Sequence, residues 1–262
     1  MIYVNGDSWS QRSNIDPDYS WPCVLQSRVK CRVINQAAGC GSNSRILSNL
    51  YKLYHTNTKP NLILIGLTVH SRWHLPSKMS SSWNIGHGII NDRFAKKNDV
   101  KFHRDLNNEN KLLAFFVDDV YDEIEYIYQM FNQIWQIHEL ATNYFKCPVI
   151  FFNSWFSPHA DYHLANVYEE ICKDPRAWVL STGADIDDYS THEYVAAFNF
   201  FKTKFNEWQL VLDSWSDLVY NKIDDDKGLH PGHPSPEGHK MICDSVLDTI
   251  EQRYPLLYKE LI

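Results

Sequence analysis

The sequence predicts an α/β fold in which a parallel β-sheet is covered by helices on both faces. Short apolar runs with little polar alternation recur along the chain, and such runs are typical of strands buried on both faces. Longer amphipathic stretches separate them, which implies right-handed crossovers between parallel strands. Ligands of such sheets bind beyond the carboxyl ends of the strands, so we expect the functional site there.

Five apolar runs are predicted to form the strands of this sheet. They are Ile2–Asn5, Cys31–Asn35, Leu62–Leu67, Pro148–Phe152 and Ala177–Leu180. The clearest helix is predicted over Asp118–Phe145, where apolar residues recur at three- and four-residue steps. Shorter helices are predicted over residues 20–29, 43–54, 161–173 and 205–220.

A final helix is predicted to begin directly after Ser235. Serine is a favoured N-cap residue, and Pro236 suits the first helical position. Ile242, Val246, Ile250 and Tyr254 then recur at four-residue spacing and form an apolar stripe on one face. We therefore expect this helix to pack against the sheet.

The length of 262 residues suits one domain over residues 1–262. Two stretches interrupt the strand–helix repeat. Residues 76–117 are polar and rich in Ser, Asn and His, and residues 182–204 are acidic and then aromatic. Long connections inside a domain are often functional, so we interpret both as insertions that wall or cover a site. The alternative is that they are ordinary surface loops.

The composition is that of a globular protein, with 44% hydrophobic and 22% charged residues. A net charge of -7 without a basic stripe gives no reason to expect a nucleic-acid partner. No apolar run reaches the length of about 18 residues that a membrane helix needs, so no membrane partner is expected. The N-terminus lacks the features of a signal peptide, which predicts a cytoplasmic or virion-associated protein.

The sequence Gly6-Asp7-Ser8 follows the first predicted strand at once. These residue types are frequent in turns, so a plain turn is one interpretation. A nucleophile at the carboxyl end of the strand is the other. The second is favoured by GLHPGHPSPEGHK at residues 228–240, which places histidines directly before the final helix. A serine hydroxyl becomes a good nucleophile when a nearby imidazole takes its proton.

These two segments, in this order, resemble sequence blocks of the SGNH (GDSL-type) hydrolase family. GDSW at residues 6–9 resembles the first block, with Ser8 as the nucleophile, and HPSPEGH at residues 233–239 resembles the fifth, with His233 as the base. The resemblance implies a three-layer α/β/α sandwich with a flavodoxin-like parallel five-stranded sheet. It also implies ester hydrolysis, often the removal of acyl groups from carbohydrates. The chain is similar to the phage-like branch of the family.

Two further segments correspond to the blocks that form the oxyanion hole. INQAAGCGSNSRI at residues 34–46 resembles the second block, whose turn gives a backbone N–H to the oxyanion, here from Cys40 or Gly41. Ser8 would supply another backbone N–H. The third block usually reads Gly-x-Asn-Asp, but Thr68 stands here in the place of the Asn. Thr68 and Asn43 are the two side chains that could replace that donor.

The acid of the triad also departs from the family pattern. The family places Asp three residues before the histidine, and here His230 occupies that position. Asp226 or Asp225 could supply the acid through a longer loop, or the site could act as a serine–histidine dyad. An alternative register makes His230 the base, but Lys227 then stands where the acid is expected.

We therefore predict a serine esterase that removes an acyl group, most often acetyl, from a carbohydrate. The substrate would be a small-molecule or glycan ester, with no cofactor and no metal. His230, His233 and His239 could instead bind a metal, but a catalytic zinc needs a more complete ligand set.

The rival prediction is an SGNH fold without activity, serving as a carbohydrate-binding or virion structural protein. A lipase or thioesterase is a weaker alternative, because no long apolar lid is visible. No oligomeric state follows from the sequence.

Overall fold

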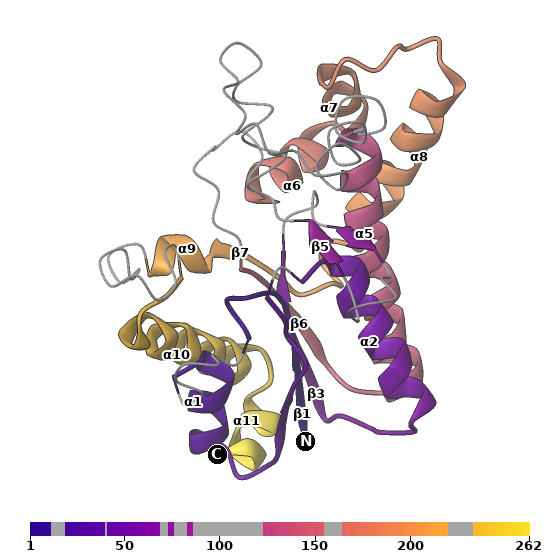
Figure 1. Ribbon diagram of the computed structural model, residues 1–262. Coiled ribbons are helices and arrows are strands. Elements are labelled where there is room, and N and C mark those ends of the chain that lie inside the picture. The colour runs from indigo at the N-terminus through magenta and orange to yellow at the C-terminus, as the bar shows by residue number, and fades with distance from the viewer. Residues whose placement is uncertain are drawn as a thin grey trace.

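The computed structural model describes residues 1–11, 19–39, 41–68, 73–75, 83–85, 123–154, 164–219 and 233–262. Its main sheet has five parallel strands in the order β2-β1-β3-β6-β7 (Figure 1). The strands are β1 (Ile2–Asn5), β2 (Val33–Asn35), β3 (Leu62–Leu67), β6 (Val149–Asn153) and β7 (Leu210–Ser214). Counted within the sheet, this order is 2-1-3-4-5, which is that of flavodoxin-like folds. The predicted fold class is confirmed.

Helices cover both faces of the sheet (Figure 1). One face carries α1 (Trp21–Arg28), α10 (Pro236–Arg253) and α11 (Pro255–Leu261). The other carries α2 (Asn43–His55), α5 (Glu123–Glu139), the π-helical segment η1 (Leu140–Phe145), α6 (Leu164–Lys173), α7 (Pro175–Ser181) and α8 (Tyr189–Lys204). The short helix α9 (Trp215–Leu218) follows β7, and β4 (Trp73–Leu75) pairs antiparallel with β5 (Trp83–Ile85). No helix among the described residues is both long and apolar enough to cross a membrane.

The strands separate two hydrophobic cores. Tyr3 and Ile63 belong to the core beneath α2 and α5, whereas Val4 and Leu64 belong to the core beneath α1 and α10. Successive side chains of a strand point to opposite faces, so a strand covered on both sides must be apolar at every position. All four of these side chains are fully buried. This explains why the central strands were predictable as uninterrupted apolar runs.

One predicted strand is wrong. Ala177–Leu180 lies in helix α7, not in the sheet. The helix begins where Asp174 Oδ1 accepts hydrogen bonds from the backbone N–H groups of Arg176 (2.9 Å) and Ala177 (3.2 Å). Asp as N-cap and Pro at the next position form a strong helix start. A four-residue apolar run cannot by itself distinguish a strand from a buried helix segment.

The fifth strand is β7, which lies in the region 205–220 that was predicted to be helical. Leu210, Val211 and Leu212 are only partly buried because β7 forms the edge of the sheet. Edge strands show a weaker apolar signal than central strands. The helical prediction holds only for the four residues of α9.

Residues 182–204 also differ from the expected long connection, since most of them form helix α8. Asp188 caps this helix by accepting a hydrogen bond from the Ser190 backbone N–H at 3.0 Å. Phe198 and Phe201 are buried and pack against Phe131 of α5, with ring centroids 6.3 Å and 5.9 Å apart. The aromatic residues of this stretch therefore belong to a core. The other predicted insertion, residues 76–117, lies outside the described residues apart from β5.

The long helix and the final helix are confirmed. The predicted helix over Asp118–Phe145 appears as α5 followed by η1, and its first residues lie outside the described part. At the other end of the chain, Ser235 Oγ accepts a hydrogen bond from the Gly238 backbone N–H at 3.2 Å and caps α10. Of the predicted stripe, Ile242, Val246 and Ile250 are fully buried, whereas Tyr254 follows the last residue of α10 and is only partly buried.

Both chain ends lie at the amino edge of the sheet, where the strands begin (Figure 1). The Met1 carbonyl accepts a hydrogen bond from the Asn61 N–H at 2.8 Å, directly before β3. The Leu261 carbonyl accepts one from the Lys30 N–H at 2.7 Å, shortly before β2. The two termini are thus held on the same side of the molecule.

Candidate active site

Buried polar side chains gather at the carboxyl edge of the sheet. Four strands of the main sheet, β1, β3, β6 and β7, end at or near polar residues that are less than 4% exposed: Asn5, Asp7, Thr68, Asn153, Ser154 and Ser214. Burying a polar group destabilises the folded state unless the group is paired. A concentration of such groups at one edge therefore indicates a candidate functional site. This is the edge at which parallel sheets bind their ligands.

The turn after β1 carries Ser8. The Gly6 N–H donates to Asn5 Oδ1 at 2.9 Å, and the Trp9 N–H donates to Asp7 Oδ1 at 3.0 Å. Asp7 is 2% exposed, whereas Ser8 is only partly buried. The Asp7 carboxylate therefore braces the turn, and Ser8 is presented at its outer side.

Ser10 packs against two glycines, Gly6 in the turn after β1 and Gly66 in β3. A Cβ atom added to Gly6 would lie 2.8 Å from Ser10 Oγ, and one added to Gly66 would lie 2.9 Å from the same atom. Trp21 Nε1 donates to Ser10 Oγ at 3.2 Å, and Asn35 Nδ2 donates to the Ser10 carbonyl at 2.7 Å. Ser10 and Asn35 were not predicted as site residues. The position of Asn35 at the end of a strand is the one sequence signal that could have indicated its contact with this turn.

The glycine-rich turn after β2 packs backbone against backbone on the turn that carries Ser8. A Cβ atom on Gly41 would lie 2.7 Å from the Gly6 carbonyl oxygen and 3.4 Å from Asp7 Cα. The Ala38 N–H donates to the Gly6 carbonyl at 3.3 Å, and the Gly41 N–H donates to the Ala38 carbonyl at 2.9 Å. The Gly41 N–H is thus engaged within its own turn. Cys40, the other candidate donor, lies outside the described residues.

Asn43 and Thr68 are joined by two hydrogen bonds, which we call the Asn43–Thr68 bridge. Asn43 Nδ2 donates to the Thr68 carbonyl at 2.8 Å, and the Thr68 N–H donates to Asn43 Oδ1 at 3.0 Å. Asn43 is the first residue of α2, whose N-cap Ser42 accepts from the Arg45 N–H at 3.2 Å. The bridge therefore ties the start of α2 to the end of β3.

The Thr68 hydroxyl is buried without a partner. Thr68 is 3% exposed, and its Oγ1 forms no hydrogen bond within the described part of the chain. The neighbouring hydroxyl, that of Ser154 at the end of β6, donates to the Leu67 carbonyl at 2.7 Å. The Ser154 hydroxyl thus has a hydrogen-bond partner, whereas the Thr68 hydroxyl has none among the described residues.

His233 lies directly before α10, and the course of that helix places it toward the carboxyl edge. Near the end of α10, Arg253 Nη1 donates to the Gln209 carbonyl at 2.6 Å, just before β7 begins. The first turn of α10 lies about 27 Å away along the helix. At that end α10 packs against α9, which follows the carboxyl end of β7 (Figure 1). His233 itself is partly buried.

His239 lies near the start of α10, close to His233. Burial, with a smaller contribution from His233, lowers the pKa of His239 to about 4. Its Nδ1 is buried and has no hydrogen-bond partner among the described residues. His239 is therefore neutral at pH 7, so it would not oppose a positive charge on the neighbouring imidazole.

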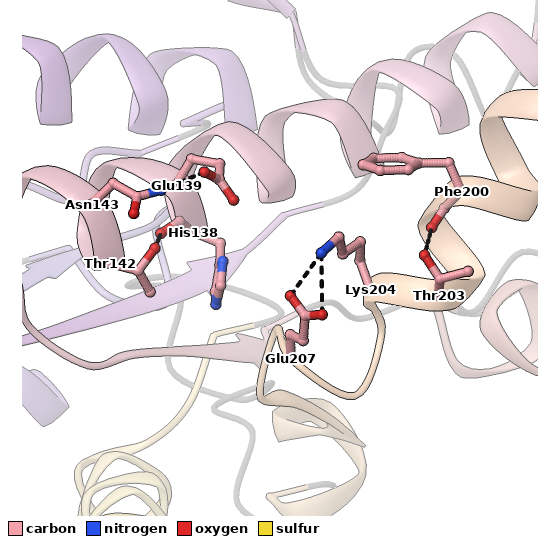
Figure 2. Close-up of polar contacts among 8 residues, drawn as sticks. All are labelled: His138, Glu139, Thr142, Asn143, Phe200, Thr203, Lys204 and Glu207. Carbon is pink, nitrogen blue, oxygen red and sulfur yellow. Dashed lines mark hydrogen bonds and ion pairs between the residues drawn. The ribbon is translucent and has the colours of Figure 1, made fainter.

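A second histidine, His138, is partly buried near the end of α5 (Figure 2). It stands at the end of α5 near Glu207, which precedes β7, and Lys204 Nζ pairs with Glu207 at 3.0 Å. Burial lowers the pKa of His138. The described residues contain no cluster of three or more His, Cys, Asp or Glu side chains that could hold a metal.

Of the predicted site residues, the structure describes Ser8, Gly41, Asn43, Thr68 and His233. The first four come from three separate segments that meet at the ends of β1 and β3. Cys40, Asp226 and His230 lie outside the described residues.

Comparison with solved structures relates this arrangement to known proteins. The crystal structure of TesA matches with a TM-score of 0.50 at 14% identity, over 96% of this chain and 98% of that chain. A psychrotrophic esterase, EstA from Pseudoalteromonas sp., has a TM-score of 0.48 at 13% identity, over 96% of each chain. A member of the lipolytic protein G-D-S-L family from Veillonella parvula has a TM-score of 0.44 at 11% identity, over 97% of each chain.

No protein-family profile and no curated protein sequence matches this chain. The structural likeness therefore stands on the shape of the backbone and not on sequence identity. Together with the order of the five parallel strands, the likeness to TesA shows that the chain has a flavodoxin-like α/β fold.

Proposed function

We propose that the protein is a serine hydrolase that cleaves carboxylic esters, with Ser8 as the nucleophile and His233 as the base. The observation that carries the proposal is the turn after β1. Asp7 braces this turn, and Gly41 packs against its backbone from the second segment. Ser8 is thereby presented at the edge toward which the start of α10 brings His233. The sequence resemblance to the SGNH (GDSL-type) hydrolases supports the same assignment.

The reaction follows from the chemistry of these two side chains. Ser8 Oγ attacks the ester carbonyl carbon while His233 takes the hydroxyl proton. The tetrahedral intermediate then breaks its bond to the alcohol oxygen, and His233 gives the proton to that leaving group. The acyl group remains on Ser8 as an ester. A water molecule attacks this ester while His233 takes its proton. The second tetrahedral intermediate then breaks its bond to Ser8 Oγ, and His233 gives the proton to that oxygen, which releases the acid and restores the free serine.

Backbone N–H groups would stabilise the oxyanion of both intermediates. The Ser8 N–H is one proposed donor. For the second, the hydrogen bond from Gly41 to Ala38 favours Cys40, because the Gly41 N–H already has an acceptor. Neutral His239 permits the imidazolium that forms on His233, since it adds no charge nearby.

The proposed substrate is a carbohydrate that carries a small acyl ester, acetyl above all. The support for this is the sequence resemblance, whose family often removes acyl groups from carbohydrates. The resemblance to the phage-like branch extends the proposal to glycans of a cell surface. The rival function, a carbohydrate-binding or virion protein with the same fold, predicts no reactive serine.

Fluorophosphonate labelling followed by intact-mass measurement tests the proposal. We expect one adduct on the wild type and none on Ser8→Ala. As a control, Ser181→Ala, which changes an exposed serine of α7, should label like the wild type. His233→Ala should lower hydrolysis of acetylated sugars by about 10⁵–10⁶-fold, as for other triads. Circular dichroism verifies that each variant is folded.

Two outcomes would change the assignment. A folded wild type that forms no adduct would contradict the esterase and favour the rival binding protein. We expect Asp226→Ala to lose less activity than His233→Ala. Equal losses would identify Asp226 as the acid that orients the imidazole.

A further inference from the structure

We propose that the Thr68 hydroxyl donates a hydrogen bond to the oxyanion and that Asn43 is the residue that positions it. This inference rests on the proposed ester hydrolysis at Ser8. It assigns different roles to two side chains that the sequence alone leaves as equal alternatives. Thr68 would touch the reacting oxygen, whereas Asn43 would act only through Thr68.

The sheet register brings Thr68 beside the turn that carries Ser8. Strand β1 pairs with β3 up to Asn5 and Ile65, and the two strands remain in contact one residue later. There a Cβ on Gly6 would lie 3.2 Å from the Gly66 carbonyl oxygen. Thr68 follows two residues after Gly66, at the same edge of the sheet.

The segment after β2 contacts both the turn that carries Ser8, through Gly41, and Thr68, through the Asn43–Thr68 bridge. Asn43 belongs to the segment that follows β2, Thr68 follows β3, and β1 lies between those two strands. The bridge and the turn that carries Ser8 therefore occupy the same small region. Because both hydrogen bonds go to the Thr68 backbone, they fix its position and leave its side chain free for another contact.

The Thr68 hydroxyl is buried and has no acceptor among the residues that the structure describes. Most buried hydroxyls are paired, and Ser154 on the neighbouring strand shows that a carbonyl acceptor is available at this edge. An unpaired buried donor destabilises the folded state, and valine would fill the same space without that penalty. A donor that is unpaired in the free protein and close to the nucleophile is suited to a charge that forms only during the reaction.

Asn43 is a positioning residue in this arrangement. Its amide oxygen and one amide hydrogen are both engaged by the Thr68 backbone, at 3.0 Å and 2.8 Å. Asn43 is 3% exposed and begins a capped helix, so its own position is fixed. Removing its side chain would release residue 68 but would not remove a group that touches the substrate.

The test measures the rate of fluorophosphonate labelling at Ser8, together with kcat and KM for an acetylated sugar. Thr68→Val should lower kcat and the labelling rate by about 10²–10³-fold with KM nearly unchanged, as for loss of one oxyanion donor. Its Tm should equal or exceed that of the wild type. Thr68→Ser keeps a hydroxyl and should retain most of the activity.

The role of Asn43 is tested by a double mutant. Asn43→Ala should lower kcat, but its effect should disappear in the Thr68→Val background, because both changes act through one hydroxyl. Asn43→Asp, which can accept from the Thr68 N–H but cannot donate to its carbonyl, should fall between wild type and Asn43→Ala. Asn49→Ala on the same helix is the matched control and should leave kcat unchanged.

The outcomes separate the two proposals. If Ser8 of the wild type labels and Thr68→Val labels equally fast, the oxyanion role of Thr68 is wrong and the esterase stands. If the losses of Asn43→Ala and Thr68→Val multiply, Asn43 does not act through Thr68. If the folded wild type does not label at all, the esterase itself is wrong, and this inference is wrong with it.

Discussion

At the scale of single residues, burial keeps His239 uncharged at neutral pH close to His233, the proposed base. His239 has a pKa of about 4 because it is buried, compared with about 6.5 in an unfolded chain. The folded state therefore resists protonation at this position. The same burial that keeps His239 neutral makes the fold sensitive to acid.

We predict that the free energy of unfolding falls as the pH drops from about 6.5 to about 4. The folded-state pKa of His239 is lowered, so its contribution to stability is complete above the unfolded pKa and is lost as the pH falls toward the folded one. The loss is at most about 3 kcal/mol. Urea unfolding across this pH range should show a shallower dependence for His239→Gln than for the wild type. His192→Gln, on the exposed side of α8, should behave like the wild type.

The sequence predicted single residues unequally well. Ser8 and His233 stand beside recognisable signals, a strand followed by Gly-Asp and a proline-rich helix start, so they could be proposed directly. The Asn43–Thr68 bridge could not be predicted, because it joins residues 25 positions apart. Such a contact depends on which strands are neighbours.

At the scale of elements, the backbone of the second turn is as important as its side chains. Gly41 packs against the Gly6 carbonyl at a distance that leaves no room for a Cβ atom. A Cβ atom on Gly39, two residues earlier, would meet the end of the Gln11 side chain among the described residues. A side chain at position 41 would thus collide with backbone atoms, whereas one at position 39 would meet a side chain that can move.

We predict that Gly41→Ala lowers the free energy of unfolding by about 1–3 kcal/mol and also slows labelling of Ser8, because the new atom pushes the two turns apart. Gly39→Ala should change the unfolding free energy by no more than about 0.5 kcal/mol, since a flexible side chain can move aside. Denaturant unfolding and labelling rates measure both effects. Equal destabilisation by the two variants would contradict this packing.

Elements were predictable where burial left a simple pattern. Leu62–Leu67 is covered on both faces, so its apolar run identified it as a strand. Strand β7 has one neighbour and partial burial, and a nearby apolar run in α7 took its place in the prediction. Local composition cannot distinguish strand β7 from helix α7, because their secondary structure depends on where each segment packs.

At the scale of the whole molecule, the sheet divides the interior into two cores that share no side chains. Ile134 belongs to the core beneath α5, and Ile250 belongs to the core beneath α10. Both are fully buried. Since the backbone of the sheet lies between them, a cavity in one core should not change the packing of the other.

We predict that Ile134→Ala and Ile250→Ala each cost about 2–5 kcal/mol and that the double mutant shows their sum within about 0.5 kcal/mol. Urea unfolding of the three variants gives the comparison. Phe131→Leu with Phe198→Leu is the matched pair on one face, whose rings lie 6.3 Å apart, and this pair should couple. A coupling above about 1 kcal/mol between the two isoleucines would show that the cores are not independent.

The position of the chain ends has a consequence for how this protein could be attached to something larger. Met1 and Leu261 are both anchored at the amino edge of the sheet, and Ser8 lies at the carboxyl edge. A tether or fused domain joined through either end would leave the carboxyl edge, where the proposed nucleophile lies, uncovered and facing away from the attachment. Immobilisation through a terminus should therefore not block the proposed site.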